Sequence, residues 1–170
     1  IVPVPVSRIP ARTSEAAAEK GARDVSIVDA GPPEEPRART FAGDPEIQWR
    51  YGLAAGTPTG QFAAVAIPVS AGLEAFARVR FRVTASQPAR LWVQLRAPVG
   101  NTERWGRTFY ADAESRIVDL SFATFAPIGA TSTAQPPIDR VSHLLFVADT
   151  LNTLPGDGRV VRISEVGFVK

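Results

Sequence analysis

The residues best suited to binding chemistry occupy one arginine-rich run, "ARVRFRVTASQPARLWVQLR", at positions 77–96. Its alternation of polar and apolar residues predicts two β-strands joined by a turn. One side of the pair would carry six residues: Arg78, Arg80, Arg82, Trp92, Gln94 and Arg96. If the strands pair with each other, the six share one sheet surface.

Such a surface suits a polysaccharide or an acidic glycan. Aromatic rings stack on sugar faces, while amide and guanidinium groups donate to hydroxyls or carboxylates. On this interpretation the ligand-binding residues are Trp92, Gln94, Arg96, Arg82 and Arg80. The other interpretation is a solvated or salt-bridged outer face, on which arginine stems cover the tryptophan.

A second group of polar residues lies in "DTLNTLPGDG", residues 149–158. Asp149, Asn152 and Asp157 supply oxygen ligands of the kind that calcium prefers. Their spacing differs from that of an EF-hand, and Asx turns explain Asp and Asn in loops equally well. A structural calcium ion is therefore one of two explanations for this loop.

Catalytic residues are scarce. The chain has no cysteine and one histidine, His143, at the start of an apolar strand, where a structural role is expected. Trp105, in "NTERWGRTFYAD", is expected in the core rather than stacked on a sugar. A carboxylate pair drawn from Glu103, Asp112 and Glu114 remains open, although acids beside turns are usually solvated. We therefore expect a protein that is not an enzyme.

Composition indicates a single globular domain with an appended arm. The chain has 170 residues, of which 45% are hydrophobic and 21% charged. No apolar run approaches the roughly 18 residues that would predict a membrane span. The formal net charge of +2 does not predict nucleic-acid binding. Because the sequence begins at Ile1 and contains no methionine, we interpret it as a fragment of a larger protein.

The pattern of residues changes after position 36. Residues 1–36 contain alternating prolines, a short "SEAAAEKG" helix candidate and "GPPEEP", which together predict an extended Pro-rich arm or linker. Residues 37–170 contain period-two runs separated by turn residues, about eight to ten strands in all. The runs "QFAAVAIPV", "SHLLFVAD" and "RVVRISEVGFV" alternate less strictly, which favours central positions. The fold prediction is all-β: a two-sheet antiparallel β-sandwich with an extended N-terminal arm.

The order and character of these strands resemble galactose-binding-like jelly-roll domains. The resemblance rests on "ARVRFRVTASQPARLWVQLRAP", "ERWGRTFY", "RIVDLSFATFAPIG" and "RVSHLLFVADTLNTLPGDGRVVRISEVGF", and covers roughly residues 40–170. This group includes many carbohydrate-binding modules and the related domain of the complex I intermediate-associated proteins. In many such modules an aspartate on the last strand helps to hold calcium. Here the sequence departs from that pattern, with Ser164 and Glu165 in place of the acidic pair, and Glu165 is the one residue of the two that could still ligate calcium.

The resemblance implies a non-catalytic carbohydrate-binding-like module of a larger secreted or cell-envelope protein. The alternative is a structural or protein-interaction module without a sugar ligand, which serves as a spacer, docking or assembly domain. In that case the N-terminal arm would contact a neighbouring chain or domain. The first expectation places the protein outside the cytoplasm, in a secreted or cell-envelope setting.

Overall fold

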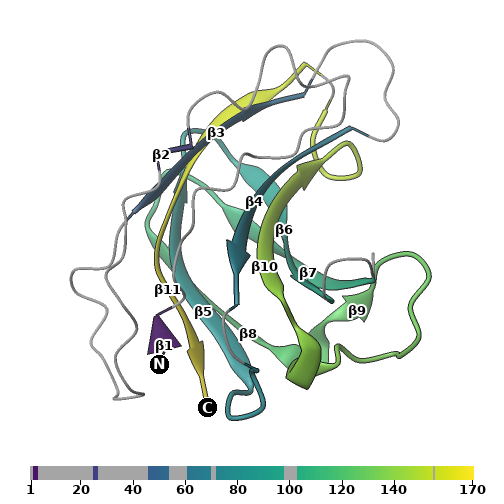
Figure 1. Cartoon of the computed structure of the whole chain (residues 1–170). Helices are drawn as coiled ribbons and strands as arrows, with labels where there is room; N and C mark the ends of the chain where they lie inside the picture. The colour runs from purple at the N-terminus through teal and green to yellow at the C-terminus, as the bar shows by residue number, and fades with distance from the viewer. Residues whose placement is uncertain are drawn as a thin grey trace.

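The chain forms two antiparallel β-sheets that face each other (Figure 1). This computed structural model describes residues 2–3, 25–26, 46–53, 61–69, 72–97, 103–154 and 156–170. Sheet A has the strand order β2 (Val25–Ser26), β3 (Ile47–Gly52), β11 (Gly158–Val169), β5 (Arg78–Ala85), β8 (Arg116–Ser121), and β1 (Val2–Pro3) also pairs with β11. Sheet B has the order β4 (Phe62–Pro68), β10 (His143–Asp149), β6 (Ala89–Arg96), β7 (Arg104–Ala111), β9 (Ala126–Pro127). The predicted all-β sandwich is confirmed.

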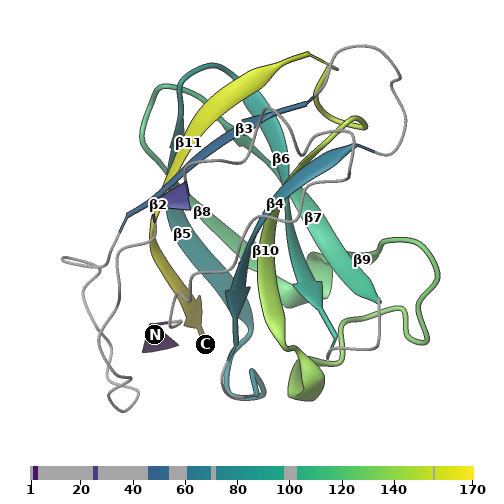
Figure 2. The same cartoon turned by 45° about the horizontal axis from the view of Figure 1, so that its top comes forward.

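Two 3-10 turns, η2 (Phe122–Thr124) and η3 (Ile138–Arg140), complete the described elements. In the part of the chain that the structure describes, no helix has the length and apolar character to cross a membrane. Figure 2 shows the two sheets from a second direction, with β11 and β5 in one layer and β10 and β6 in the other.

The core lies between the sheets because alternate side chains of each strand point inward. Val79, Phe81 and Val83 of β5 are buried, as the alternation predicts. Leu91, Val93 and Leu95 of β6 are buried in the same way. The Phe81 ring lies 5.0 Å, centroid to centroid, from those of Phe109 and Phe146, which belong to sheet B. This aromatic cluster therefore joins the two sheets through the middle of the sandwich.

Trp105 also belongs to the core, as predicted. Its side chain is buried, and its Nε1 donates a hydrogen bond to the carbonyl oxygen of Thr133 at 2.9 Å. The bond anchors the segment after β9 to the start of β7. A buried indole N–H needs such a partner, so the contact satisfies the polar edge of the ring.

Residues 77–96 form two strands joined by a turn, as predicted, but the two strands do not pair with each other. Strand β5 belongs to sheet A and β6 to sheet B, so the turn at residues 86–88 carries the chain from one sheet to the other. Arg80 and Arg82 consequently lie on the outer face of sheet A. Trp92, Gln94 and Arg96 lie on the outer face of sheet B, on the opposite side of the sandwich.

The expected central strands are confirmed in two cases of three. Strand β10 lies between β4 and β6, and β11 lies between β3 and β5. Strand β4 lies at the end of sheet B instead. Its run of apolar residues has another cause: the outer side of β4 is covered by apolar side chains, as described below.

Two short pieces of the predicted arm pair with sheet A. Val2 and Pro3 of β1 lie opposite Phe168 and Gly167, and β2 pairs with β3. The "SEAAAEKG" helix candidate and "GPPEEP" lie outside the described residues. The described pieces of the arm thus extend the chain's own sheet by strand addition.

Strand β11 contains a β-bulge where its register with β5 shifts between Ser164 and Gly167. Glu165 in the bulge has a φ of 55°, in the left-handed region that few non-glycine residues adopt. Its carboxylate accepts a hydrogen bond from Nε of Arg82 at 2.8 Å. The bulge therefore turns an acidic side chain toward an arginine of the neighbouring strand.

Candidate binding face on sheet B

The outer face of sheet B is built from two register rows that cross its strands. The first row contains Ala64, Val147, Trp92 and Thr108. The second row contains Ala66, Leu145, Gln94, Gly106 and Ala126. Because side chains alternate along each strand, all of these residues point away from the core. The two rows form the floor of the candidate site.

Much of this floor is apolar, although it faces outward. Ala64, Leu145 and Val147 form a buried cluster that is separate from the main core, and Phe62, Ala66 and Trp92 pack against it. Outward positions of an antiparallel sheet are normally polar. An apolar stripe on the outer side of β4, β10 and β6 therefore departs from the usual pattern, and it provides an apolar base against which Phe62 and Trp92 pack.

Two polar groups lie on β6 beside this cluster. The side-chain oxygen Oε1 of Gln94 and the indole Nε1 of Trp92 are buried, and neither has a hydrogen-bond partner among the residues that the structure describes. Gln94 is only 2% exposed. Because a buried polar atom without a partner destabilises the fold, each invites a ligand or a water molecule. Together they offer one acceptor and one donor, two residues apart on the same face.

Gly106 explains how Gln94 becomes covered. A Cβ atom at this position would lie 2.7 Å from Cδ1 of Ile128 and 3.0 Å from Cγ of Gln94. The absence of a side chain lets Ile128 approach the strand closely. The prediction that Gln94 points outward holds, but the side chain lies beneath Ile128 rather than in open solvent.

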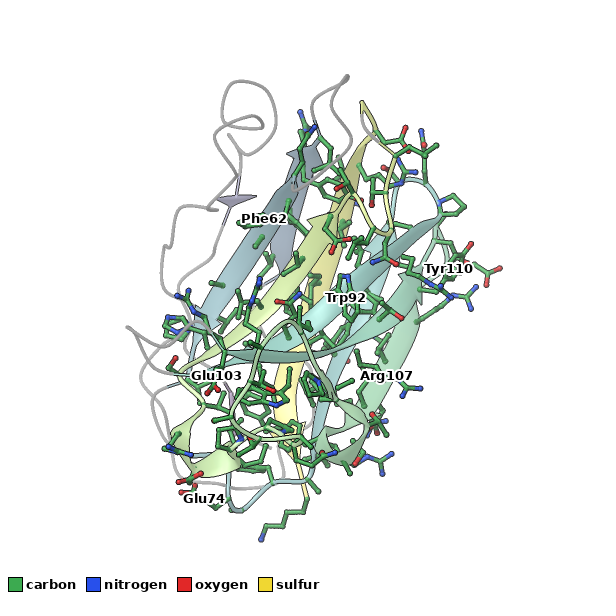
Figure 3. All side chains as sticks on the ribbon, turned by 90° about the vertical axis from the view of Figure 1, so that its right-hand side faces the viewer. Phe62, Glu74, Trp92, Glu103, Arg107 and Tyr110 are labelled. Atoms are coloured by element: carbon green, nitrogen blue, oxygen red, sulfur yellow. The ribbon has the colours of Figure 1, made fainter. Side chains whose placement is uncertain are left out.

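Three aromatic rings lie across the upper half of this face in Figure 3: Phe62 on β4, Trp92 on β6 and Tyr110 on β7. Phe62 and Trp92 are half-buried, whereas Tyr110 is 49% exposed. The guanidinium carbon of Arg116 lies 5.7 Å from the centroid of the Tyr110 ring, within cation–π range. Arg116 also hydrogen-bonds Asp112, which lowers the pKa of that carboxyl group.

His143 begins β10 and lies on the same outer face, opposite Arg96 of β6. Its Nδ1 lies 3.0 Å from Oγ of Ser142. Burial, and then the nearby charge of Arg96, lowers the pKa of His143 below its ordinary value of 6.5. The folded protein therefore favours the neutral imidazole.

This pKa shift predicts a pH dependence of stability. Below pH 6.5 the unfolded chain binds a proton at His143 more readily than the folded chain does. The free energy of unfolding should consequently decrease as the pH falls from about 6.5 toward the lower folded pKa. We expect His143→Gln to remove this component, as measured by urea unfolding of both proteins between pH 7.5 and 5. Parallel curves for the two proteins would contradict the shift.

The four candidate calcium ligands do not form one site. Oδ1 of Asp149 accepts hydrogen bonds from the backbone N–H of Leu151 and from the backbone and side-chain N–H of Asn152. Asp157 pairs with Arg159, and Glu165 pairs with Arg82. Within the described ranges no three Asp, Glu, His or Cys side chains are grouped closely enough to hold a metal ion. The Asx-turn explanation fits the 149–152 contacts, since they brace the turn locally.

The outer face of sheet A fits the second interpretation of the arginine-rich run, that of a salt-bridged outer surface. Arg78 pairs with Asp119 at 2.8 Å, and Arg82 pairs with Glu165 at 2.8 Å. Arg80 lies opposite Asp119 in the register of β5 and β8. The arginines of β5 thus lie beside carboxylates of β8 and β11. Arg80 and Arg82, predicted as ligand contacts, belong to this charge-balanced face and not to the floor around Trp92.

The carboxylates considered for hydrolysis lie apart. Glu103, beside the start of β7, accepts hydrogen bonds from the backbone N–H and the hydroxyl of Ser132. Asp112 follows the other end of β7, and Glu114 shares Arg116 with it. Glu103 is therefore separated from the other two by the length of a strand.

No protein-family model matches the chain, and no curated protein matches it in sequence. Solved structures do match it. A family 30 carbohydrate-binding module of a cellulosomal cellulase from Clostridium thermocellum has a TM-score of 0.63 and 10% identity, over 98% of this chain and 94% of that one. A family 11 module from the same organism, solved with a β-1,3-1,4-mixed-linked tetrasaccharide, has a TM-score of 0.60 and 11% identity, over 96% and 90%.

An exo-β-agarase also matches, with a TM-score of 0.51 and 10% identity, but the match covers 94% of this chain and only 22% of the agarase. The likeness is therefore to a small part of that enzyme, whereas the carbohydrate-binding modules match along nearly their whole length. Identities this low establish architecture and not ligand. The chain has the jelly-roll β-sandwich fold of carbohydrate-binding modules.

Proposed function

We propose that this protein is a non-catalytic glycan-binding module and that the outer face of sheet B around Trp92 is its binding surface. The observation that carries the proposal is the pair of buried atoms, Nε1 of Trp92 and Oε1 of Gln94, without partners in the described chain. A sugar hydroxyl both donates and accepts hydrogen bonds. It can therefore satisfy either of these atoms, which an apolar ligand cannot.

The apolar floor supports the same proposal. The carbon-bound faces of pyranose rings are apolar, and they pack against aromatic side chains much as other apolar surfaces do. Trp92 lies in the middle of the floor, with Phe62 on one side and Tyr110 on the other (Figure 3). Strands lie about 4.8 Å apart, so the three strand intervals from β4 to β7 span about 14 Å. An oligosaccharide laid across the strands would meet all three rings.

The likeness to modules of cellulosomal cellulases supports a corresponding setting for this chain. We propose that it forms one part of a larger extracytoplasmic protein and holds that protein on a polysaccharide. Recognition is passive in this proposal: the chain supplies affinity, and any chemistry on the polysaccharide belongs to other domains.

A protein-interaction module is the second candidate. Leu151 and Leu154, in the segment between β10 and β11, are 83% and 73% exposed. Exposed leucines so close in sequence are a feature of docking surfaces, although single exposed apolar residues are common. In this case the segment between β10 and β11 would contact a protein, and sugars would not compete with it.

A binding screen of the whole chain against neutral and acidic polysaccharides tests the proposal. We expect saturable binding to at least one polysaccharide, which short oligosaccharides of the same sugar displace. The intrinsic tryptophan fluorescence should change on binding, because Trp92 lies on the proposed surface. If no polysaccharide in a broad panel binds, the proposed function is wrong and the protein-interaction candidate takes its place.

A further inference from the structure

Three basic residues form a third row across the outer face of sheet B. His143 of β10 lies opposite Arg96 of β6, and Arg96 lies opposite Arg104 of β7. Side chains directly opposite each other on antiparallel strands have Cβ atoms about 4.5–5.5 Å apart. All three side chains are half-buried, so water screens the charges of Arg96 and Arg104 incompletely, and the neutral imidazole of His143 adds a hydrogen-bonding group beside them. The row lies next to the one that contains Gln94.

This row lacks compensating negative charge in the part of the chain that the structure describes. Neither Arg96 nor Arg104 forms an ion pair or a side-chain hydrogen bond with a described residue. The carboxylate of Glu103, adjacent to Arg104 in sequence, is bonded to Ser132. The nearby Arg140 is paired with Asp139.

The outer face of sheet A shows the opposite arrangement. Arg78 has Asp119, Arg82 has Glu165, and Arg162 has Glu46 at 3.4 Å. These three arginines of sheet A therefore each have a carboxylate partner, whereas Arg96 and Arg104 of sheet B have none among the described residues.

Like charges placed directly opposite each other on a sheet destabilise it. An anion bound between Arg96 and Arg104 would attract both guanidinium groups and so offset their repulsion. The guanidinium fork binds carboxylates and sulfates bidentately, and two adjacent forks can hold one anionic group from two sides. We propose that Arg96, Arg104 and His143 form an anion subsite, and that the glycan which this module binds carries carboxylate or sulfate groups.

The inference rests on the proposed function, because it names the class of glycan bound at the same face. Arg96 follows Gln94 by two residues on β6, which corresponds to about 6.8 Å along the strand. Trp92 lies the same distance further on. One oligosaccharide can therefore stack on Trp92 and place an acidic substituent at the row.

The test uses polysaccharides that differ only in charge. Polygalacturonate would be compared with its methyl ester, and carrageenan with its desulfated form, by isothermal titration of the whole chain. The variant Arg96→Gln/Arg104→Gln removes two charges from sheet B. The control Arg78→Gln/Arg162→Gln removes two charges from sheet A and so matches the change in net charge. Thermal unfolding checks that both variants are folded.

We expect the wild type to bind at least one acidic form more tightly than its neutral counterpart. The sheet B variant should lose about tenfold or more of that affinity, as expected when a charged ligand loses charged hydrogen-bond donors. Its affinity for neutral polysaccharide should fall by much less than its affinity for the acidic form, and the control should bind as the wild type does. The two polysaccharide pairs show whether the preferred group is a carboxylate or a sulfate.

Several results would overturn the inference. Equal losses in both double variants would indicate general electrostatic attraction without a subsite. Preference for the neutral forms would refute the anion subsite while leaving the proposed function intact. Tighter binding of single-stranded DNA than of any acidic glycan, with the same dependence on Arg96 and Arg104, would assign the row to nucleic acid. Absence of binding to every polysaccharide would refute the proposed function itself.

Discussion

Replacing Phe81 with alanine is expected to lower the free energy of unfolding by about 3–5 kcal/mol, the usual effect of removing a buried phenylalanine side chain. Phe81 is 1% exposed, and its ring contacts Phe109 and Phe146 edge to face. These partners belong to the opposite sheet. The substitution thus leaves a cavity where the two layers meet, and neither sheet can close it without moving the other. Urea unfolding followed by circular dichroism measures the change.

Phe76→Ala is the matched control for this prediction. Phe76 is half-buried at the margin of the core, and its ring lies 6.1 Å from that of Phe168. The same atoms are removed, but solvent and nearby side chains can fill the space. We expect a clearly smaller loss of stability. Equal losses for Phe76→Ala and Phe81→Ala would show that the aromatic cluster does not hold the sheets together.

Replacing Trp92 with alanine is expected to lower the affinity for the glycan found in the screen by at least about 30-fold, or 2 kcal/mol, the scale of a central aromatic contact in an interface. The indole supplies both the stacking surface and the unpartnered N–H. Since that N–H has no hydrogen bond to a described residue, the substitution breaks none. Titration calorimetry measures the affinity, and thermal unfolding shows whether the sandwich remains intact.

Trp92→Phe separates the two contributions of the indole. It keeps an aromatic ring for stacking but removes the N–H, so we expect an intermediate affinity. Trp105→Phe serves as a second control. Trp105 is buried in the core, and that substitution should reduce stability with little effect on affinity. Unchanged binding by Trp92→Ala would exclude the Trp92 surface as the binding site.

The fold could be predicted because the sequence alternates with period two wherever a strand has one wet face. Ile47, Trp49 and Tyr51 of β3 are all buried, as their spacing predicts. The same alternation does not predict which strands pair with each other. Residues 77–96 look like a hairpin because alternation reports which side of a strand is buried and not which strand lies beside it. The partners of β5 are β8 and β11, which are distant in sequence.

The candidate site was predicted in part. Trp92, Gln94 and Arg96 point outward from sheet B as expected, but Arg80 and Arg82 belong to the other sheet. The apolar residues of the floor, such as Leu145 and Val147, were missed because an uninterrupted apolar run was taken as a sign of a central strand. Strand β10 is apolar on both sides because it is central and because its outer face is covered. Strand β4 lies at the end of its sheet, so only its covered outer face explains its apolar residues.

The basic row was not visible in the sequence at all. Arg96 and Arg104 are separated by seven residues, and His143 follows almost forty residues after Arg104. Only the register of β10, β6 and β7 brings the three side chains onto one line. The sequence signal that remains is indirect: each of the three lies at an end of its strand.

The strand order also constrains how the chain can assemble during synthesis. Strand β3 pairs with β2 and β11, and β4 pairs with β10. Strands β3 and β4 therefore lack β11 and β10 until those strands are translated, about 80 to 110 residues later, at roughly 5–20 residues per second. In that interval β4 would present an unpaired edge and an apolar outer surface. The nascent chain is consequently expected to depend on chaperones until its last two strands emerge, and to refold slowly in vitro because its contacts are so distant in sequence.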